Sequence, residues 1–509
     1  AVGSIIGQSY LGWELCLVDD ASTNPDTLKV LEDVRRSLEQ SGKIKYIKRL
    51  TQGGVVAATN DALSLASAPY VAFVDHDDLL YEDALLEITL RLKEETHYRL
   101  IYTDSVMIDL TGKLLHIYHK PDWSPESLCH LNYINHLTIV QREFLLQLNG
   151  LSQVFEGSQD WDMLLRMAEK LEEKDVCHIR TPLYAWRATK QSLAYHASAK
   201  PGAFEAGMKA VRAHLERRGI KEPQTIPSHN GSGVFCTWLA AQPLVEIIVP
   251  THNNLAGLKN CVDGIVLGTT YPNYKMTIIA NRCSDIAMQS YLDSLSTYQH
   301  VKVVSDDSLF NWAAINNRIA EKSDSDLLLF MNDDVEIHCT DWLSLMSRHF
   351  ELKGVGIVGA TLHYPNGKIQ HNGIHTGQEW VAANITSIGS YGEQSITRNV
   401  AAVTGACLLV KRSVYEEVGG FDERFAVNYN DVDFCLAARY IGHRIVQEVN
   451  VSLTHHESIS RNKVNPHDVA PERKYEFELM REKWQHFLFD PYWSEYTIHA
   501  QGTRILHVD

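Results

Sequence analysis

Residues 327–334 read LLLFMNDD, so five apolar residues lead directly into Asn332, Asp333 and Asp334. Residues 70–78 read YVAFVDHDD and have the same pattern. A short apolar run that ends in polar turn residues is typical of a buried strand. Because ligands bind beyond the carboxyl ends of the strands in open α/β sheets, the two stretches predict an α/β fold with acidic side chains at the ligand-binding edge.

The elements around these stretches also occur twice. In the first half, the β-rich run at 13–18 (WELCLV) is followed by Asp20. In the second half, the runs at 245–250 (VEIIVP) and 275–279 (KMTII) are predicted strands, and the latter is followed by Asn281. A similar interval separates each of these polar residues from the acidic stretch after it. The sequence therefore predicts two tandem copies of one α/β domain.

The domain borders follow from composition. We expect domains at 1–225 and 244–465, a linker at 226–243 and a C-terminal extension at 466–509. The linker lies in a stretch that is rich in Pro, Ser and Gly; an ordered surface loop inside one large domain is the alternative. The first copy starts at Ala1 inside the helix that should follow an opening strand, so we expect that copy to lack this strand.

Composition limits the class of protein. The 509 residues are 45% hydrophobic, and 47 basic against 63 acidic residues give a net charge of −16. This charge argues against a nucleic-acid partner. Nine cysteines without a C-x-x-C pair favour a reducing compartment, and no apolar run approaches the ~18 residues of a membrane span. We expect a cytoplasmic protein, free or peripheral on the inner face of the cell membrane.

The acidic turns have the chemistry of a divalent metal site. Asp75 and Asp77, like Asn332 and Asp334, place oxygen ligands on a tight turn after a strand. Mg²⁺ or Mn²⁺ bound there through carboxylates keeps positions open for substrate phosphates and can neutralise a diphosphate leaving group. A surface turn would explain either pair alone, but the strand context and the repetition favour the metal.

Two further acid pairs begin amphipathic helices. They are Asp160 with Asp162 and Asp431 with Asp433. Carboxylates in the first turn of a helix stabilise its dipole, which is one explanation of both pairs. The other is a general base that takes the proton from an acceptor hydroxyl. Both copies place the pair well after the metal turn, which favours the base.

Histidine or arginine side chains follow in both copies. His455 and His456 close the second α/β section, where they either belong to the core or complete the metal shell with a neutral imidazole. Arg461 and Arg187 either contact phosphate or are solvated.

These residues together resemble family-2 glycosyltransferases of the nucleotide-sugar-dependent GT-A type, in particular tandem bacterial surface-polysaccharide (rhamnosyltransferase-like) enzymes. The resemblance rests on IIVPTHNN, FNWAAINN, FMNDDVEI, YPNGKIQHNG, VTGACLLVKR, GGFDERFAVNYNDVDFCL and HHESISR in the second half, and on LVDDAST, FVDHDDLL, DWD and LYAWR in the first. It implies two GT-A-like domains, each with a Rossmann-like, mostly parallel mixed sheet, and a helical C-terminal tail.

The resemblance also implies roles for individual residues. Asp77, Asp334 and His455 match metal ligands, and Asp160 and Asp431 match the catalytic base. The expected contacts to the nucleotide sugar come from Asp20, Asp75, Thr251, Asn281 and Asn332, to which we add Arg187 and Arg461. In the first copy, Ala185 stands where the family has the histidine that matches His455. In the second, Asn281 lies in a stretch (IANRC) that departs from the family pattern.

The function implied is a metal-dependent, inverting transfer of a sugar from a UDP- or dTDP-sugar to a hydroxyl of a glycan or lipid-linked glycan, in O-antigen or capsule synthesis. A glycoside hydrolase would need two carboxylates flanking the scissile bond, which the duplicated strand-end acids do not suggest. As an alternative, the first domain is inactive and serves as a glycan-binding or assembly module.

Overall fold

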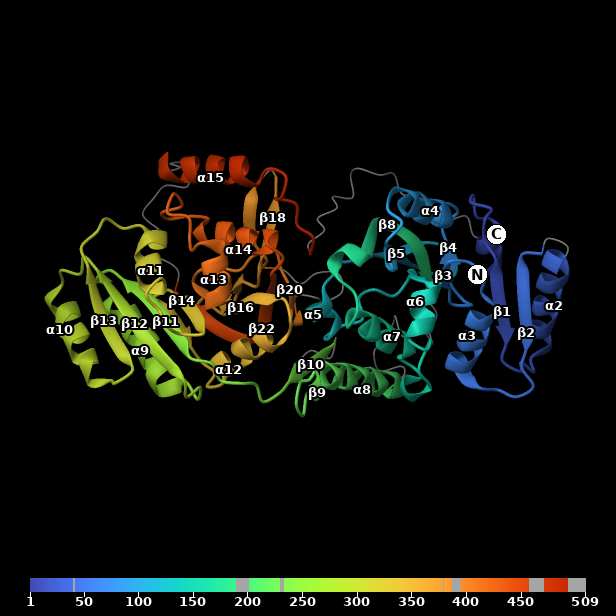
Figure 1. Ribbon diagram of the computed structural model, residues 1–509, viewed down its shortest axis with the longest axis horizontal. Helices are drawn as coiled ribbons and strands as arrows, with labels where there is room; N and C mark the ends of the chain where they lie inside the picture. The colour runs from blue at the N-terminus through green and yellow to red at the C-terminus, as the bar shows by residue number, and fades with distance from the viewer. Residues whose placement is uncertain are drawn as a thin grey trace. The chain divides into compact units, whose positions relative to one another are not determined.

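The computed structural model describes residues 1–39, 42–188, 201–228, 233–378, 380–386, 395–456 and 471–492. They form two compact units, one within Ala1–Cys236 and one within Thr237–Trp493 (Figure 1). Each unit is built of helices on a mixed sheet, which confirms the predicted fold class. Among the described residues, no helix combines the length and apolar character that a membrane span requires.

The second unit is organised around one ten-stranded sheet, in the order β13-β12-β11-β14-β21-β16-β22-β15 with β17 and β20 paired at its side. Its strands are β11 (Val245–Thr251), β12 (Tyr274–Asn281), β13 (Val301–Asp306), β14 (Leu327–Met331), β15 (Val335–Ile337), β16 (Val355–His363), β17 (Ile369–His371), β20 (Arg398–Asn399), β21 (Cys407–Lys411) and β22 (Arg444–His455). A separate hairpin pairs β18 (Ile374–Gly377) with β19 (Val381–Asn384).

Helices cover this sheet. They are α9 (Leu255–Gly268), α10 (Ile286–Ser294), α11 (Trp312–Ala320), α12 (Trp342–Ser347), α13 (Arg412–Val418), α14 (Asn430–Tyr440) and α15 (Pro471–Trp484). Strands β11 and β14 are buried at every residue, as expected where helices pack on both faces of a sheet. Because β13, β12, β11 and β14 pair in parallel, their carboxyl ends meet at one edge, and the polar residues at those ends come together there.

An aromatic core lies beneath this edge. Phe421 packs edge-on against Trp312 of α11 and Phe330 of β14, with ring centroids 4.9 and 4.7 Å apart. Phe434 of α14 packs against the same ring at 4.7 Å. Buried aromatic rings contribute large apolar areas, so this cluster fixes α14 relative to the strand that carries the acidic turn.

The first unit contains most of the same arrangement. Its strands are β1 (Leu15–Asp19), β2 (Ile44–Lys48), β3 (Tyr70–Phe73), β4 (Leu79–Leu80), β5 (Leu100–Ile108), β6 (Leu114–Tyr118), β7 (Thr138–Gln141), β8 (Val176–Arg187), β9 (Gln224–Pro227) and β10 (Val234–Thr237). Its helices are α1 (Val2–Ile6), α2 (Pro25–Glu39), α3 (Gly54–Leu65), α4 (Ala84–Glu94), α5 (Pro125–Leu128), α6 (Arg142–Gln147), α7 (Gln159–Ala168) and α8 (Pro201–Arg217).

The strand orders of the two units correspond. The order β3-β7-β5-β8-β4 matches β14-β21-β16-β22-β15, with the same pairing directions. The parallel pair β1/β2 matches β12/β13 but forms a sheet of its own. Within the described residues of the first unit, no strand takes the place of β11 between β1 and β3. Strands β9 and β10, which pair with each other, lie partly inside the expected linker 226–243.

Candidate functional site

A cleft of about 1530 Å³ opens at the carboxyl edge of the second sheet. It is lined by the ends of β11, β12, β14 and β22 and by the start of α14. All the predicted site residues of this unit that the structure describes contribute to its lining: Thr251, Asn281, Asn332, Asp334, Asp431 and His455. Arg461 lies outside the described residues.

Strand pairing brings an imidazole against the acidic turn. β15 pairs with β22 so that Val335, the residue after Asp334, lies opposite His455. The Nε2 atom of His455 is 3.1 Å from Oδ1 of Asp334 and 3.3 Å from Nδ2 of Asn332. Carboxylate oxygen and imidazole nitrogen are both ligands for divalent metals, so this pair fits an ion at the wall of the cleft.

The middle residue of the turn was missed in the sequence analysis. Asp333 accepts hydrogen bonds from Oγ1 of Thr251 at 2.6 Å and Nδ2 of Asn254 at 3.1 Å. Burial raises the pKa of Asp333 to about 6, although these two donors act in the opposite direction. Asp333 therefore connects the end of β11 to the acidic turn. The hydroxyl hydrogen of Thr251 is used in that contact.

Asn281 fixes the end of β12 in a similar way. Its Nδ2 donates to the carbonyl of Ser308 at 3.0 Å. The same Nδ2 lies 3.3 Å from the backbone carbonyl oxygen of Asp306 and 3.3 Å from its Oδ1. Its own carbonyl accepts from Nδ1 of His252 at 2.9 Å. Asn281 thus shapes the floor of the cleft by joining three connecting loops.

The structure separates the two acids that begin α14. Asp431 lines the cleft, where its oxygens accept the backbone N–H groups of Gly405 and Val432, each at 2.8 Å. Burial raises its pKa above the ordinary range, against the effect of these donors. Asp433 instead accepts from Nε1 of Trp484 at 2.8 Å and pairs with Lys483 at 2.7 Å, both on α15.

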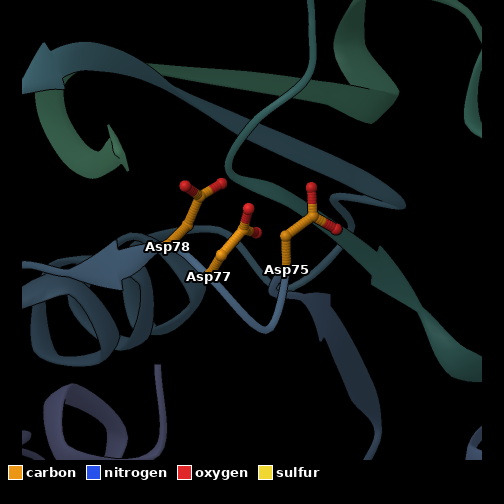
Figure 2. Close-up of side chains that lie close together, drawn as sticks. All are labelled: Asp75, Asp77 and Asp78. Carbon is orange, nitrogen blue, oxygen red and sulfur yellow. The ribbon is translucent and has the colours of Figure 1, made fainter. Parts of the chain in front are cut away.

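The first unit carries the acidic cluster drawn in Figure 2. Ligand oxygens of Asp75, Asp77 and Asp78 lie within 4.8 Å of one another. Asp75 and Asp77 are exposed, whereas Asp78 is buried and accepts from the Tyr184 hydroxyl at 2.6 Å and the Arg187 backbone N–H at 2.9 Å. The Arg187 guanidinium donates to the Asp77 carbonyl, which places this predicted residue over the turn.

A histidine absent from the predicted set adjoins this cluster. Nε2 of His136 is 3.4 Å from Oδ2 of Asp75, and its ring lies against that of Tyr184 at 5.3 Å. Nζ of Lys120 donates to the carbonyls of Ile134 and His136, both at 2.7 Å, and so holds the segment. No spacing in the sequence connects His136 with Asp75, because the contact depends on how β7 pairs with β3.

The strand registers bring no histidine of β8 to the acidic turn of this unit. Leu79 lies opposite Ala185, so the position opposite Asp78, the residue after Asp77, is that of Trp186. Because His455 lies opposite the residue after Asp334, this register gives Trp186 as its counterpart, whereas the pairing of β5 with β8, compared with that of β16 with β22, gives Ala188.

The remaining predicted residues of the first unit have defined partners. Asp160 begins α7 and accepts from Nδ2 of Asn135, while Asp162 pairs with Arg166 at 2.7 Å. Burial raises the pKa of Asp160, and the charge of His136 opposes this rise.

Asp20 accepts the N–H groups of Gly53 and Gly54 at 2.8 and 2.9 Å and pairs with Arg49 at 3.0 Å. It therefore joins the end of β1 to the start of α3. This is the kind of connection that Asn281 makes in the second unit.

Comparison with known proteins gives a consistent result. The model of "Glycosyl transferase family 2" matches residues 1–139 and 246–419. An uncharacterized protein of Sinorhizobium fredii is 34% identical over 504 residues, which cover 96% of this chain and 55% of that protein. The O-antigen biosynthesis protein RfbC of Myxococcus xanthus is 33% identical over 481 residues, covering 93% of this chain and 37% of RfbC. The chain thus spans about half the length, or less, of these curated relatives.

Among solved structures, GalNAc-T7 with UDP, GalNAc and Mn²⁺ is 12% identical, with a TM-score of 0.43 over 51% of this chain and 52% of that one.

Proposed function

Since the chain belongs to glycosyl transferase family 2, we propose that its second unit transfers a sugar from a nucleotide-sugar donor to a hydroxyl of a glycan acceptor. The transfer requires Mg²⁺ or Mn²⁺ and inverts the anomeric configuration. The observation that carries this proposal is one cleft that contains both a metal-ligand pair, Asp334 with His455, and a separate buried carboxylate, Asp431.

The chemistry of the cleft supports a single displacement. Asp431 takes the proton of the acceptor hydroxyl, whose oxygen forms a bond to the anomeric carbon as the bond from that carbon to the diphosphate oxygen breaks. A divalent ion held by Asp334 and His455 would supply the Lewis acidity that offsets the charge of the diphosphate. Because one carboxylate reacts and no covalent sugar intermediate forms, the configuration at the anomeric carbon inverts.

The raised pKa of Asp431 suits this role. A carboxylate whose pKa lies above the ordinary Asp range is a stronger base at neutral pH, and burial is the cause of the rise here. The two backbone donors orient the carboxylate without neutralising it. Asp433 is held by Lys483 and Trp484 on the other side of the helix, so we assign it a structural role.

The name of one relative suggests the pathway class. RfbC is described as an O-antigen biosynthesis protein, and we propose that this chain likewise acts on bacterial surface polysaccharide. The donor that we propose is a UDP- or dTDP-sugar, contacted by Thr251, Asn281 and Asn332 of the cleft, and the acceptor is a glycan or a lipid-linked glycan.

For the first unit we propose an impaired donor site. Among the described residues it has Asp75, Asp77 and Asp160, but β8 brings no histidine to its acidic turn in the way that β22 brings His455. A glycan-binding or assembly role is therefore the second candidate function for this unit.

Turnover of a donor panel tests the proposal. The chain is incubated with UDP-, dTDP- and GDP-sugars, glycan acceptors and Mn²⁺, and the released nucleoside diphosphate is measured. We expect release from at least one donor, its loss on chelation, and its loss in Asp431→Asn. Asp433→Asn, with the same change of charge on the same helix, is the control for folding. Release that persists in full in chelator contradicts the metal assignment.

A further inference from the structure

A β-bulge in the second unit directs a buried glutamine at His455. In the hairpin of β16 and β17, His363 pairs with Ile369 and Leu362 with His371, so Gln370 is the extra residue. Bulges re-aim side chains and are frequent next to active sites. Gln370 is only 4% exposed, and its Oε1 lies 2.8 Å from Nδ1 of His455.

This contact determines which ring nitrogen of His455 carries a proton. An amide oxygen only accepts hydrogen bonds, so Nδ1 of His455 must donate to Gln370. Of the two neutral tautomers, the one with a lone pair on Nε2 fits this contact, in agreement with the Asn332 amide that points its Nδ2 at Nε2 from 3.3 Å. Two different side chains thus favour the same tautomer.

The second ring nitrogen of His455 faces the acidic turn. Nε2 of His455 and Oδ1 of Asp334 are 3.1 Å apart, so one cation can be bound by both atoms. Metal-ligating histidines usually donate their other N–H to an oxygen that fixes the ring, and Gln370 offers that oxygen.

The first unit provides a natural contrast at the same position. Its hairpin of β5 and β6 has the same bulge, because Ile108 pairs with Leu114 and Met107 with His116. The extra residue is Leu115, which is 42% exposed. The unit that lacks a histidine opposite its acidic turn therefore also lacks the glutamine that would hold one.

We infer that Gln370 is a positioning residue that fixes the ring of His455 with Nε2 toward the metal. The inference rests on the proposed metal-dependent function of the second unit. It predicts that loss of the Gln370 oxygen weakens metal binding although Gln370 never touches the ion.

Mn²⁺ affinity tests this role in the full chain. All variants carry Asp77→Ala so that the acidic turn of the first unit does not contribute, and unbound Mn²⁺ is measured by electron paramagnetic resonance. We expect Gln370→Leu to weaken Mn²⁺ binding about 10–100-fold, the usual effect of removing such a partner. Gln370→Glu keeps an acceptor oxygen and should retain most of the affinity. Leu115→Gln, at the matching bulge, should change nothing.

The outcomes distinguish the two proposals. If Gln370→Leu binds Mn²⁺ like its parent while His455→Ala binds it weakly, the positioning role is wrong and the metal site stands. If His455→Ala also binds like its parent, the metal assignment of the proposed function is wrong, and this inference falls with it.

A second measurement reports the tautomer in the unaltered chain. Long-range ¹H–¹⁵N correlation spectra of the unaltered chain with Mg²⁺ report which nitrogen of His455 is protonated, with its signals assigned by their loss in His455→Ala. We expect the Nδ1-protonated tautomer, and a mixture of tautomers in Gln370→Leu. An Nε2-protonated ring in the unaltered chain overturns the inference.

Discussion

The two units pair their strands in the same order but differ around the acidic turn. In the second unit, β11 lies between β12 and β14 and brings Thr251 to Asp333. In the first unit, β1 and β2 form a separate sheet, and the histidine beside Asp75 comes from the segment before β7. The acidic turn thus occurs in both units, whereas, among the described residues, a histidine held beside that turn by a bulge glutamine occurs in the second unit.

The helix-borne acid shows the same contrast. Asp431 accepts the backbone N–H of Gly405, where an added Cβ would meet the Trp312 ring at 3.1 Å. By strand register the counterpart of Gly405 is Asn135, and there the side-chain amide, not the backbone, donates to Asp160. In both units the acid at the start of the helix therefore accepts a hydrogen bond from this position. The donor is a backbone N–H in the second unit and a side-chain amide in the first.

The largest expected effect separates the two candidate bases. Asp431→Asn should lower turnover about 10²–10⁴-fold, because general-base catalysis contributes that much, while nucleotide binding is retained. Asp160→Asn should leave turnover nearly unchanged. Nucleoside diphosphate release by the two variants is the measurement. Equal losses in both variants would contradict the impaired first site and favour an enzyme that adds two sugars in turn.

A second prediction concerns two buried acids, Glu448 in the second unit and Asp104 in the first. Glu448 accepts from Arg348 at 2.8 Å and His349 at 2.7 Å. Burial alone would raise its pKa, but these partners lower it below the usual range. Glu448→Gln should therefore destabilise the second unit by about 3 kcal/mol, since it leaves a buried cation without its counter-charge.

Asp104 is the corresponding acid of the first unit. Burial would raise its pKa too, but His119 and His178 lower it. For both acids, the stability from the lowered pKa is present above the ordinary carboxyl pKa of about 4 and is lost as pH falls below it. Calorimetric unfolding should show Glu448→Gln and Asp104→Asn shifting different transitions, and a common shift would contradict two separately stabilised units.

A third, smaller effect concerns the support of the loop before Asp431. Glu476 of α15 accepts the N–H groups of Val427 and Asn428 at 2.9 and 3.0 Å. Glu476→Ala leaves both donors unpaired, at a cost of about 1–3 kcal/mol, and should reduce turnover more than metal affinity. Glu478→Ala, on the same helix, is the control. Unchanged turnover in Glu476→Ala would show that α15 does not support the cleft.

The smallest effect is a gain in stability. Burial raises the pKa of Asp431, so the folded chain favours the protonated carboxyl. The stability that this contributes is present at low pH and is lost as pH rises through the raised pKa. At neutral pH the ionised carboxylate opposes folding, so Asp431→Asn should unfold at a slightly higher temperature than the parent. Asp433→Asn loses the Lys483 ion pair and should not. A lower unfolding temperature for Asp431→Asn would contradict the burial argument.

The sequence predicted those features that depend on local pattern. Apolar runs that end in acids located β3 and β14 and hence the acidic turns, and the resemblance to glycosyl transferase family 2 is confirmed. The pattern of the acid pair did not distinguish Asp431 from Asp433, and the resemblance implied Asp431. The physical difference between the two acids depends on tertiary structure, because Lys483 and Trp484 approach Asp433 from a helix fifty residues later.

Residues that depend on strand pairing were not predicted. Gln370 lies in the stretch YPNGKIQHNG, which carries part of the family resemblance. The direction of its side chain, however, follows from a bulge that no period in the sequence reveals. Asp333 was not predicted, because the pattern Asn332-x-Asp334 pointed to its two neighbours as the ligands. His136 meets Asp75 only through the pairing of β3 with β7. The repeated hairpin, GKLLH in one copy and GKIQH in the other, was the available signal for Gln370.

Calorimetric titration of the chain with a nucleoside diphosphate and Mn²⁺ tests the central claim most directly, namely that the complete site lies in the second unit. The account predicts one site per chain for each nucleotide that binds, abolished by chelator and by Asp334→Ala but retained in Asp77→Ala. Two sites of equal affinity, or one site that is lost in Asp77→Ala and kept in Asp334→Ala, would contradict it.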